Sequence, residues 1–203
     1  MHYLENFLAA PSFKAEVDAI GNKLRTRYEL PEVYQLGLIV PDAPAADKTL
    51  VSSGLPASFL VKVTTERWNE LGEDKTIGAT IGFAYHQGYE LELIEPGQDA
   101  GFYAQDLDPE GEIVVHHYGF LVSGVDDWVA RLEKRGVPLL VRGKLALGPV
   151  TGDFAYLDTR EECGMITELI DMRLLGIRFK MPQRLVASLA KLQVRSGKRC
   201  LQT

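Results

Sequence analysis

The chain has 203 residues, of which 46% are hydrophobic and 25% are charged, the balance of an ordinary globular protein with one large or two small domains. Its 28 acidic and 22 basic residues give a formal net charge of −6, which argues against nucleic-acid binding. No apolar run reaches the roughly 20 residues that cross a bilayer, and the first residues lack a secretory signal. Cys163 and Cys200 lie far apart and are expected to be reduced thiols. These features predict a cytoplasmic protein with no membrane contact.

The first half of the chain predicts a helical arm followed by a compact α+β unit. Residues 1–32 form the arm, because apolar side chains recur there at helical spacing (Phe13, Val17, Ile20 and Leu24). A strand is predicted over residues 33–40 and a weaker helix over 42–53. Three strand-like segments follow, the last two over 77–85 and 89–95. Residues 33–96 therefore read as a β-α-β-β-β module, and the Pro-, Gly- and Asp-bearing residues 97–113 as a linker.

The second half predicts the same unit again. Residues 114–172 contain a strand over 114–122, a helix that begins at Val125 and ends before Gly136, and final strands over 152–157 and 165–171. Residues 173–203 form a basic C-terminal tail, with a helix that opens near Pro182 and carries Leu185, Leu189 and Leu192. We expect both terminal extensions to cover sheet or dimer surface.

Direct sequence matches show that the two modules are repeats. The segment Gln35-Leu-Gly-Leu-Ile-Val corresponds to His117-Tyr-Gly-Phe-Leu-Val, and further matches follow in the same order. These matches pair Phe83-Ala84-Tyr85 with Phe154-Ala155-Tyr156, and Glu92-Leu93-Ile94 with Glu168-Leu169-Ile170. The predicted fold is α+β, with two tandem β-α-β-β-β modules.

Four polar residues occupy equivalent places in the apolar strands of the two modules. Glu92 corresponds to Glu168, and Gln35 corresponds to His117. A single buried glutamate or histidine is most simply an edge or hydrogen-bonded core residue, but a pseudo-twofold axis would bring all four together. One imidazole nitrogen and three side-chain oxygens suit a divalent ion such as Zn, Ni, Co, Mn or Mg. We therefore predict a metal site formed by Gln35, Glu92, His117 and Glu168.

Other polar residues are weaker candidates. In a regular strand His116 points away from His117, so it is expected on the opposite face, with a surface role or a supporting role behind the ligands. Tyr85 and Tyr156 are expected to be structural, although a hydroxyl group of either could reach the cavity, and Cys163 is expected to be a passive thiol. Three basic residues either bind an anionic part of a substrate or are simply solvated charges: Arg142, Lys144 and Arg160.

On these residues the sequence resembles the vicinal oxygen chelate superfamily, which includes glyoxalases, bleomycin resistance proteins and extradiol dioxygenases. The resemblance implies that the two modules curl into a mixed sheet or half-barrel around a metal cavity, commonly in a homodimer. The set Gln35, Glu92, His117 and Glu168 is similar to the ligands of lactoylglutathione lyases. Methylmalonyl-CoA epimerases usually have histidine at the position of Gln35, and extradiol dioxygenases need two histidines and one glutamate.

The resemblance implies a metal-dependent lyase or isomerase that moves a proton at a carbon next to a carbonyl, through an enediolate stabilised by the metal. Glu168 is the favoured base and Glu92 the alternative, acting on a small carbonyl-containing substrate. Two alternatives stay open. One is an epimerase that acts on acyl-CoA in the manner of methylmalonyl-CoA epimerase, and the other is a non-catalytic binding protein of the resistance type.

Overall fold

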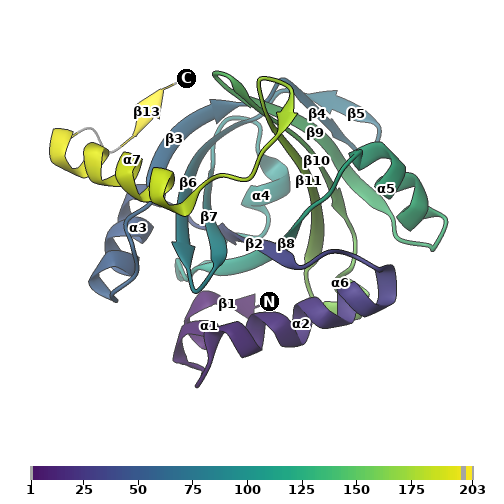
Figure 1. Cartoon of the computed structure of the whole chain (residues 1–203), viewed down its shortest axis with the longest axis horizontal. Coiled ribbons are helices and arrows are strands. Elements are labelled where there is room, and N and C mark those ends of the chain that lie inside the picture. Colours follow the sequence, from purple (N-terminus) through teal and green to yellow (C-terminus); the bar gives the residue numbers. More distant parts are fainter. Residues whose placement is uncertain (1, 198–199, 203) are drawn as a thin grey trace.

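The computed structural model describes residues 2–197 and 200–202 and consists of a strongly curled mixed β-sheet, with the longer helices on its outer side and the short helix α4 within the curl (Figure 1). The main strands run in the order β13-β3-β6-β7-β2-β8-β11-β10-β9-β4-β5. In chain order the strands are β1 (His2–Tyr3), β2 (Val33–Ile39), β3 (Phe59–Thr64), β4 (Arg67–Glu70), β5 (Glu73–Lys75), β6 (Gly78–His86), β7 (Tyr89–Pro96), β8 (Val114–Leu121), β9 (Leu139–Leu147), β10 (Val150–Leu157), β11 (Ile166–Leu174), β12 (Ile177–Arg178) and β13 (Leu201–Gln202). The helices are α1 (Leu4–Ala9), α2 (Phe13–Tyr28), α3 (Ala43–Ser52), α4 (Gly101–Ala104), α5 (Val125–Glu133), α6 (Arg160–Cys163) and α7 (Gln183–Ser196).

The two predicted modules meet at the middle of this sheet. The opening strands β2 and β8 pair antiparallel with each other, and each pairs parallel with the last strand of its own module, β7 or β11. The four strands predicted to carry metal ligands are therefore neighbours, in the order β7-β2-β8-β11. The predicted α+β fold, with a curled mixed sheet and terminal helices, is confirmed.

The sheet curls so far that two consecutive strands of the chain pair with opposite ends of the sheet. β3 pairs with β6 in the first module, and only two residues separate it from β4, which pairs with β9 of the second module. The two modules are thus joined along two lines, β2–β8 and β4–β9. This double attachment encloses the space in front of the central strands.

Apolar side chains fill both sides of the curled sheet. One core lies between the sheet and the outer helices, and includes Val17 and Leu24 of α2 and Leu132 of α5. A second core contains Trp68 of β4 and the buried aromatic residues of α4, which follows the first module. Residues 97–113, expected as a linker, therefore supply Phe102 and Tyr103 to the interior. No helix within the described residues is long and apolar enough to span a membrane.

The C-terminal helix α7 packs through a face that its leucine pattern does not predict. Leu185 and Leu192 are exposed, whereas Val186, Ala190 and Gln193 are buried against the sheet. The helix covers the sheet, as one of the two expected surfaces, but through these three residues and not through Leu185 and Leu192. The Gln193 amide donates to the Leu60 carbonyl at 2.7 Å and accepts from the Leu60 N–H at 2.9 Å.

Replacing Gln193 by alanine is expected to lower the free energy of unfolding by about 2 kcal/mol. The substitution leaves a buried N–H and a buried C=O of Leu60 without partners, and each such group carries a desolvation cost. Urea unfolding measures the change. Leu192→Ala, at an exposed position on the same helix, is the control. Equal losses for the two variants would contradict the assigned role of Gln193.

Candidate metal centre

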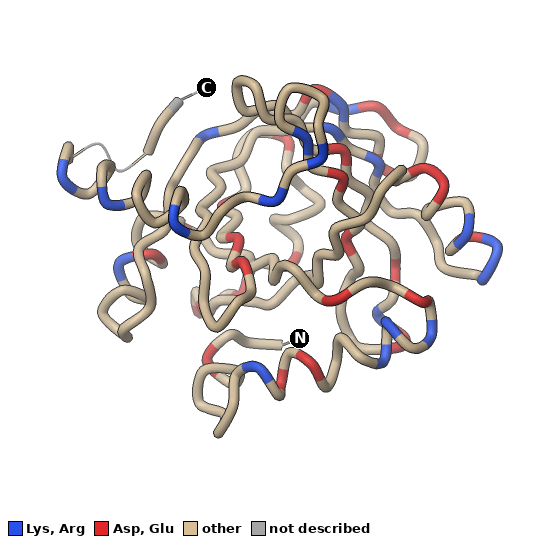
Figure 2. The backbone as a smooth tube through the Cα atoms, in the orientation of Figure 1, with Lys and Arg blue, Asp and Glu red and all other residues tan. Residues whose placement is uncertain are grey.

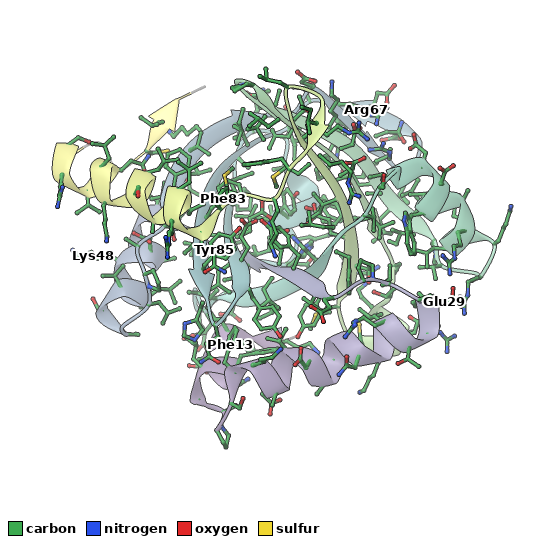
Figure 3. The ribbon with its side chains drawn as sticks, viewed as in Figure 1. Phe13, Glu29, Lys48, Arg67, Phe83 and Tyr85 are labelled. Atoms are coloured by element: carbon green, nitrogen blue, oxygen red, sulfur yellow. The ribbon has the colours of Figure 1, made fainter. Side chains whose placement is uncertain are left out.

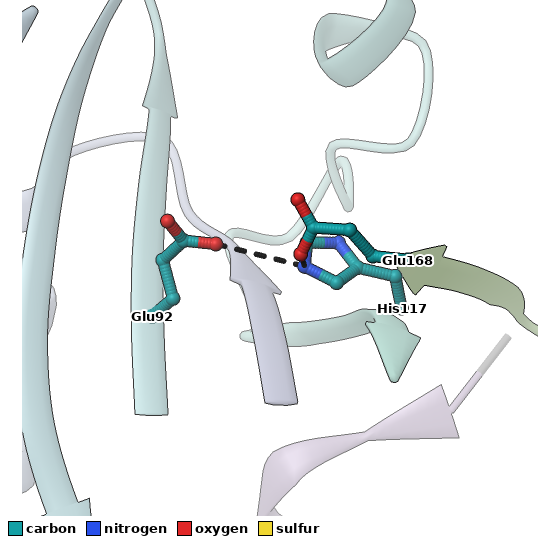
Figure 4. A group of neighbouring side chains, drawn as sticks. All are labelled: Glu92, His117 and Glu168. Atoms are coloured by element: carbon teal, nitrogen blue, oxygen red, sulfur yellow. Dashed lines mark ion pairs between the residues drawn. The ribbon is translucent and has the colours of Figure 1, made fainter. Parts of the chain in front are cut away.

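Three of the four predicted ligands converge from three strands. Glu92 of β7, His117 of β8 and Glu168 of β11 each offer a ligand atom, and these atoms lie within 4.8 Å of one another (Figure 4). His117 Nε2 is 3.1 Å from Glu168 Oε2 and 3.6 Å from Glu92 Oε2. All three residues are buried. The two modules therefore contribute to a single cluster.

The fourth predicted ligand, Gln35, lines the same cavity as the two glutamates. Its Nε2 donates a hydrogen bond to Glu90 Oε1 at 2.9 Å, which fixes the orientation of the amide. Its Oε1 is buried and has no hydrogen-bond partner. An amide oxygen held in this way is available as a ligand.

Two glycines allow the ligand-bearing strands to approach each other. Gly37 of β2 lies opposite His117 in the strand register, and Gly119 of β8 lies opposite Gln35. A Cβ atom on Gly37 would be 1.8 Å from Cε1 of the His117 ring, and one on Gly119 would be 2.8 Å from Gln35 Oε1. Each module thus provides the space that the ligand of the other module occupies.

His116 does not point to the opposite face of the sheet as expected. The pairing of β2 with β8 changes from Gly37↔His117 to Leu38↔Val115, so His116 is the extra residue of a β-bulge. Its Nδ1 lies 3.0 Å from His117 Nδ1. A bulge interrupts the alternation of side chains, and for this reason the prediction from a regular strand is wrong.

His116 supplies the partner that orients the His117 ring. His116 is buried, which lowers the pKa of its imidazole, so the neutral ring can accept a hydrogen bond. Donation from His117 Nδ1–H to His116 Nδ1 directs the Nε2 side of the His117 ring at the two glutamates. In the metal-free chain Nε2 carries a proton there, and a bound ion would take the place of that proton. His116 Nε2 faces Asp106 Oδ2 at 3.4 Å. The adjacent pair of histidines was the only sequence signal for this contact.

Glu90 is a functional-site residue that the sequence analysis missed. It lies two residues before Glu92 on β7, so both carboxylates face the cavity, and Glu90 is 1% exposed. The hydroxyl groups of Tyr34 and Tyr85 donate to its Oε2 at 2.9 and 2.6 Å. The alternation Glu90-Leu91-Glu92 was the signal that could have revealed it. Tyr85, expected to be structural, supports Glu90.

Burial and charge set the protonation of the cluster. Burial alone would lower the pKa of His117, but the carboxylates of Glu168 and Glu92 outweigh this effect and raise it to about 9. Burial raises the pKa of Glu92, and the charge of Glu168 acts in the same direction. Burial also raises the pKa of Glu90 to about 7, against the hydrogen bonds from the two tyrosines.

The carboxyl group of Glu90 is expected to make the metal-free protein less stable as the pH rises from about 4.5 to about 7. Its pKa is near 7 in the folded chain, against 4.5 for an unperturbed glutamate, so in this range the folded state binds more protons than the unfolded state. Across this pH range the ionisation of Glu90 is expected to lower the free energy of unfolding by about 3 kcal/mol. Glu90→Gln removes the charge and should flatten this part of the stability profile in urea unfolding. Glu133→Gln, an exposed control, should leave it unchanged, and parallel profiles for wild type and Glu90→Gln would contradict the prediction.

The donor atoms themselves fit a divalent ion. Gln35 Oε1 is buried and has no hydrogen-bond partner, which is costly for a polar atom unless a ligand satisfies it, while His117 Nε2 and Glu168 Oε2 are buried against each other at 3.1 Å. One imidazole nitrogen with carboxylate and amide oxygens is a donor set that suits ions of intermediate hardness. The buried group of Glu92, His117 and Glu168 can therefore hold a metal, with Gln35 as a further donor.

The cluster lies at one end of a cavity of about 100 Å³. Apart from the glutamates and Gln35, its wall is mainly aliphatic and aromatic and comes from both modules. Phe83 lines it from β6, and Figure 3 shows this residue among the side chains that fill the curled sheet. Tyr156, expected to be structural, also lines the cavity, and its hydroxyl is 2.9 Å from that of Tyr103.

The basic residues considered as anion-binding groups form local ion pairs. Arg142 contacts Asp126 and Asp153, and its guanidinium also donates to two backbone carbonyls. Lys144 pairs with Glu66, and Arg160 with Asp158. None of the three lines the cavity. The Cys163 thiol is half-buried, with a pKa that burial raises.

Residues 34–156 match the Glyoxalase/Bleomycin resistance protein/Dioxygenase superfamily. The match covers more than half of the chain, so the protein belongs to this superfamily. This finding confirms the resemblance to vicinal oxygen chelate proteins. No curated protein matches the sequence significantly.

Several solved structures are similar in fold. A hypothetical protein from Bacillus halodurans is 17% identical, with a TM-score of 0.49, over 74% of this chain and 96% of that one. A Streptomyces coelicolor methylmalonyl-CoA epimerase in complex with 2-nitronate-propionyl-CoA is 21% identical, with a TM-score of 0.49, over 74% and 99%. The methylmalonyl-CoA epimerase from Mycobacterium tuberculosis is 19% identical, with a TM-score of 0.48, over 70% and 87%.

Proposed function

We propose that this protein is a metal-dependent enzyme that transfers a proton at a carbon next to a carbonyl group, the step common to glyoxalase-type lyases and to epimerases. The observation that carries the proposal is the buried convergence of Glu92, His117 and Glu168 at the end of a largely apolar cavity. Gln35, Glu92, His117 and Glu168 would hold the ion. A divalent ion bound there would act as a Lewis acid on a substrate oxygen.

The two glutamates are suited to proton transfer. Glu168 is buried, lines the cavity and places Oε2 3.1 Å from His117 Nε2, so Glu168 is the proposed base that removes the proton from carbon. Glu92 belongs to the other module, and burial raises its pKa, which favours it as the group that holds or returns a proton. The apolar wall excludes water around the reacting carbon and strengthens electrostatic interactions there.

The test combines metal analysis with hydrogen exchange. Purified protein is offered Zn²⁺, Ni²⁺, Co²⁺, Mn²⁺ and Mg²⁺, and bound metal per chain is measured. The loaded and chelator-treated forms are then incubated in deuterium oxide with three probes: the methylglyoxal–glutathione adduct, methylmalonyl-CoA and α-hydroxyacetophenone. We expect one equivalent of metal, and deuterium at the α-carbon of at least one probe with the loaded form only.

Two outcomes would contradict the proposal. A protein that takes up none of the five ions would exclude the metal site. A loaded protein that binds a probe without exchanging its α-proton would favour a non-catalytic binding protein of the same fold.

A further inference from the structure

We infer that the ligand of this cavity is an uncharged carbonyl compound with an apolar substituent, preferably aromatic, next to the carbonyl group. The inference rests on the proposed function in one respect, that the carbonyl group faces the metal-binding cluster. It adds the chemical class of the substrate, which the four ligands leave open.

The charge of the cavity wall disfavours an anionic ligand. Three glutamates line the cavity (Glu90, Glu92 and Glu168), and no lysine or arginine among the described residues does so. A carboxylate or phosphate placed beyond the metal would therefore be buried beside like charges without a counter-ion, which is costly. The carboxylates of Glu92 and Glu168 would offset the charge of a divalent ion, so the ion would leave no net positive charge for an anionic tail.

The basic side chains beside the wall residues of β4 and β9 do not line the cavity. On β9, Leu145 and Leu147 line the cavity, whereas Lys144 on the same strand pairs with Glu66. Arg67 of β4 pairs with Asp153. Figure 2 shows lysines and arginines (blue) on outer helices and loops and along the C-terminal segment. These cations are outside the enclosed space or already paired, so an anionic tail has no partner within it.

The apolar wall is rich in aromatic rings. Trp68, fully buried, lines the cavity, and its ring lies 6.0 Å from that of Phe154 and 6.2 Å from that of Tyr156. Phe83 and Tyr103 also line it. Such rings favour edge-to-face or offset contact with another ring, in addition to the gain from burying apolar area. Met172 and Met181 complete the wall with side chains that adapt to irregular shapes.

The experiment compares three α-hydroxyketones that differ in their charge and in their apolar substituent. Binding of α-hydroxyacetophenone, its para-carboxy derivative and hydroxyacetone is measured by Trp68 fluorescence in a Trp128→Phe background, which leaves Trp68 as the single tryptophan. Both metal-loaded and metal-free protein are used. We expect α-hydroxyacetophenone to bind at least tenfold more tightly than either of the other probes. The preference for the ring over the methyl group should persist without metal, because the wall does not depend on the ion.

A variant that adds a positive charge to the cavity wall provides a second test of the inference. Leu147→Arg places a cation on the half-buried part of the cavity wall and should strengthen binding of the para-carboxy probe at least tenfold. Leu175→Arg, at an exposed position outside the cavity wall, is the matched control and should change nothing. Equal or tighter binding of the para-carboxy probe or hydroxyacetone to the unsubstituted cavity would overturn the inference.

The two proposals fail separately. Absence of metal uptake overturns the proposed enzyme but leaves the preference for the phenyl ring measurable in metal-free protein. Metal uptake and proton exchange, together with tight binding of the carboxylate, overturn only the substrate class.

Discussion

Glu168→Gln is expected to slow α-proton exchange by about 10²–10⁴-fold while the metal stays bound. A glutamine oxygen can still bind a metal, but a neutral amide cannot accept a proton from carbon. The position of the side chain should be retained, because Glu168 is buried on β11 next to His117. The measurements are deuterium incorporation into whichever probe the unsubstituted protein exchanges, and metal per chain in the same sample.

A comparison with Glu92→Gln separates the roles of the two carboxylates. We expect Glu92→Gln to reduce exchange less than Glu168→Gln, since Glu168 is the proposed base. Glu133→Gln, on the exposed side of α5, is the control for loss of a negative charge. If both cluster variants keep their metal and lose less than tenfold in rate, neither glutamate is the base. A larger loss of exchange rate in Glu92→Gln than in Glu168→Gln would identify Glu92 as the base.

Gly37→Ala is expected to disrupt the site and to destabilise the protein by about 1–3 kcal/mol, the range usual for overpacked cores. The new methyl group would occupy the position of the His117 ring, which has no exposed surface. Displacement of the ring also breaks its contact with His116, and loss of a supporting contact commonly lowers metal affinity 10–100-fold. Urea unfolding and metal titration measure the two effects.

Gly152→Ala is the matched control for this substitution. Gly152 is also a strand glycine that lines the cavity, but no atom lies within 4 Å of the position of an added Cβ. The control should therefore fold and bind metal as the unsubstituted chain does. Full stability and full metal uptake in Gly37→Ala would show that His117 does not occupy the place described.

The repeat in the sequence carried most of the predictable information. Because Gln35 corresponds to His117 and Glu92 to Glu168, a pseudo-twofold arrangement predicted which side chains converge, and the geometry of Glu92, His117 and Glu168 agrees with that expectation. The strands of each module and both terminal helices were also predictable, because each rests on local hydrophobic periodicity within one segment. The curl of the sheet was implied only by the resemblance to the vicinal oxygen chelate superfamily.

Features that depend on pairing between distant strands could not be predicted in this way. The bulge at His116 arises where β8 meets β2, and nothing in the local alternation of β8 reveals the extra residue. The attachment of β4 to β9 joins residues of different modules. The helical period of α7 identified a helix but not the face that meets β3, because Gln193 is buried for its hydrogen bonds to backbone.

The division of the ligands between the modules has a thermodynamic consequence. Of the proposed ligands, Gln35 and Glu92 come from the first repeat and His117 and Glu168 from the second, so neither half of the chain would offer the ion the full set of donors. Separation of the two modules would therefore also release the ion. By mass action, an ion that binds only the intact chain raises resistance to unfolding in proportion to the logarithm of its free concentration. The melting temperature of the protein should therefore rise with the concentration of free metal ion.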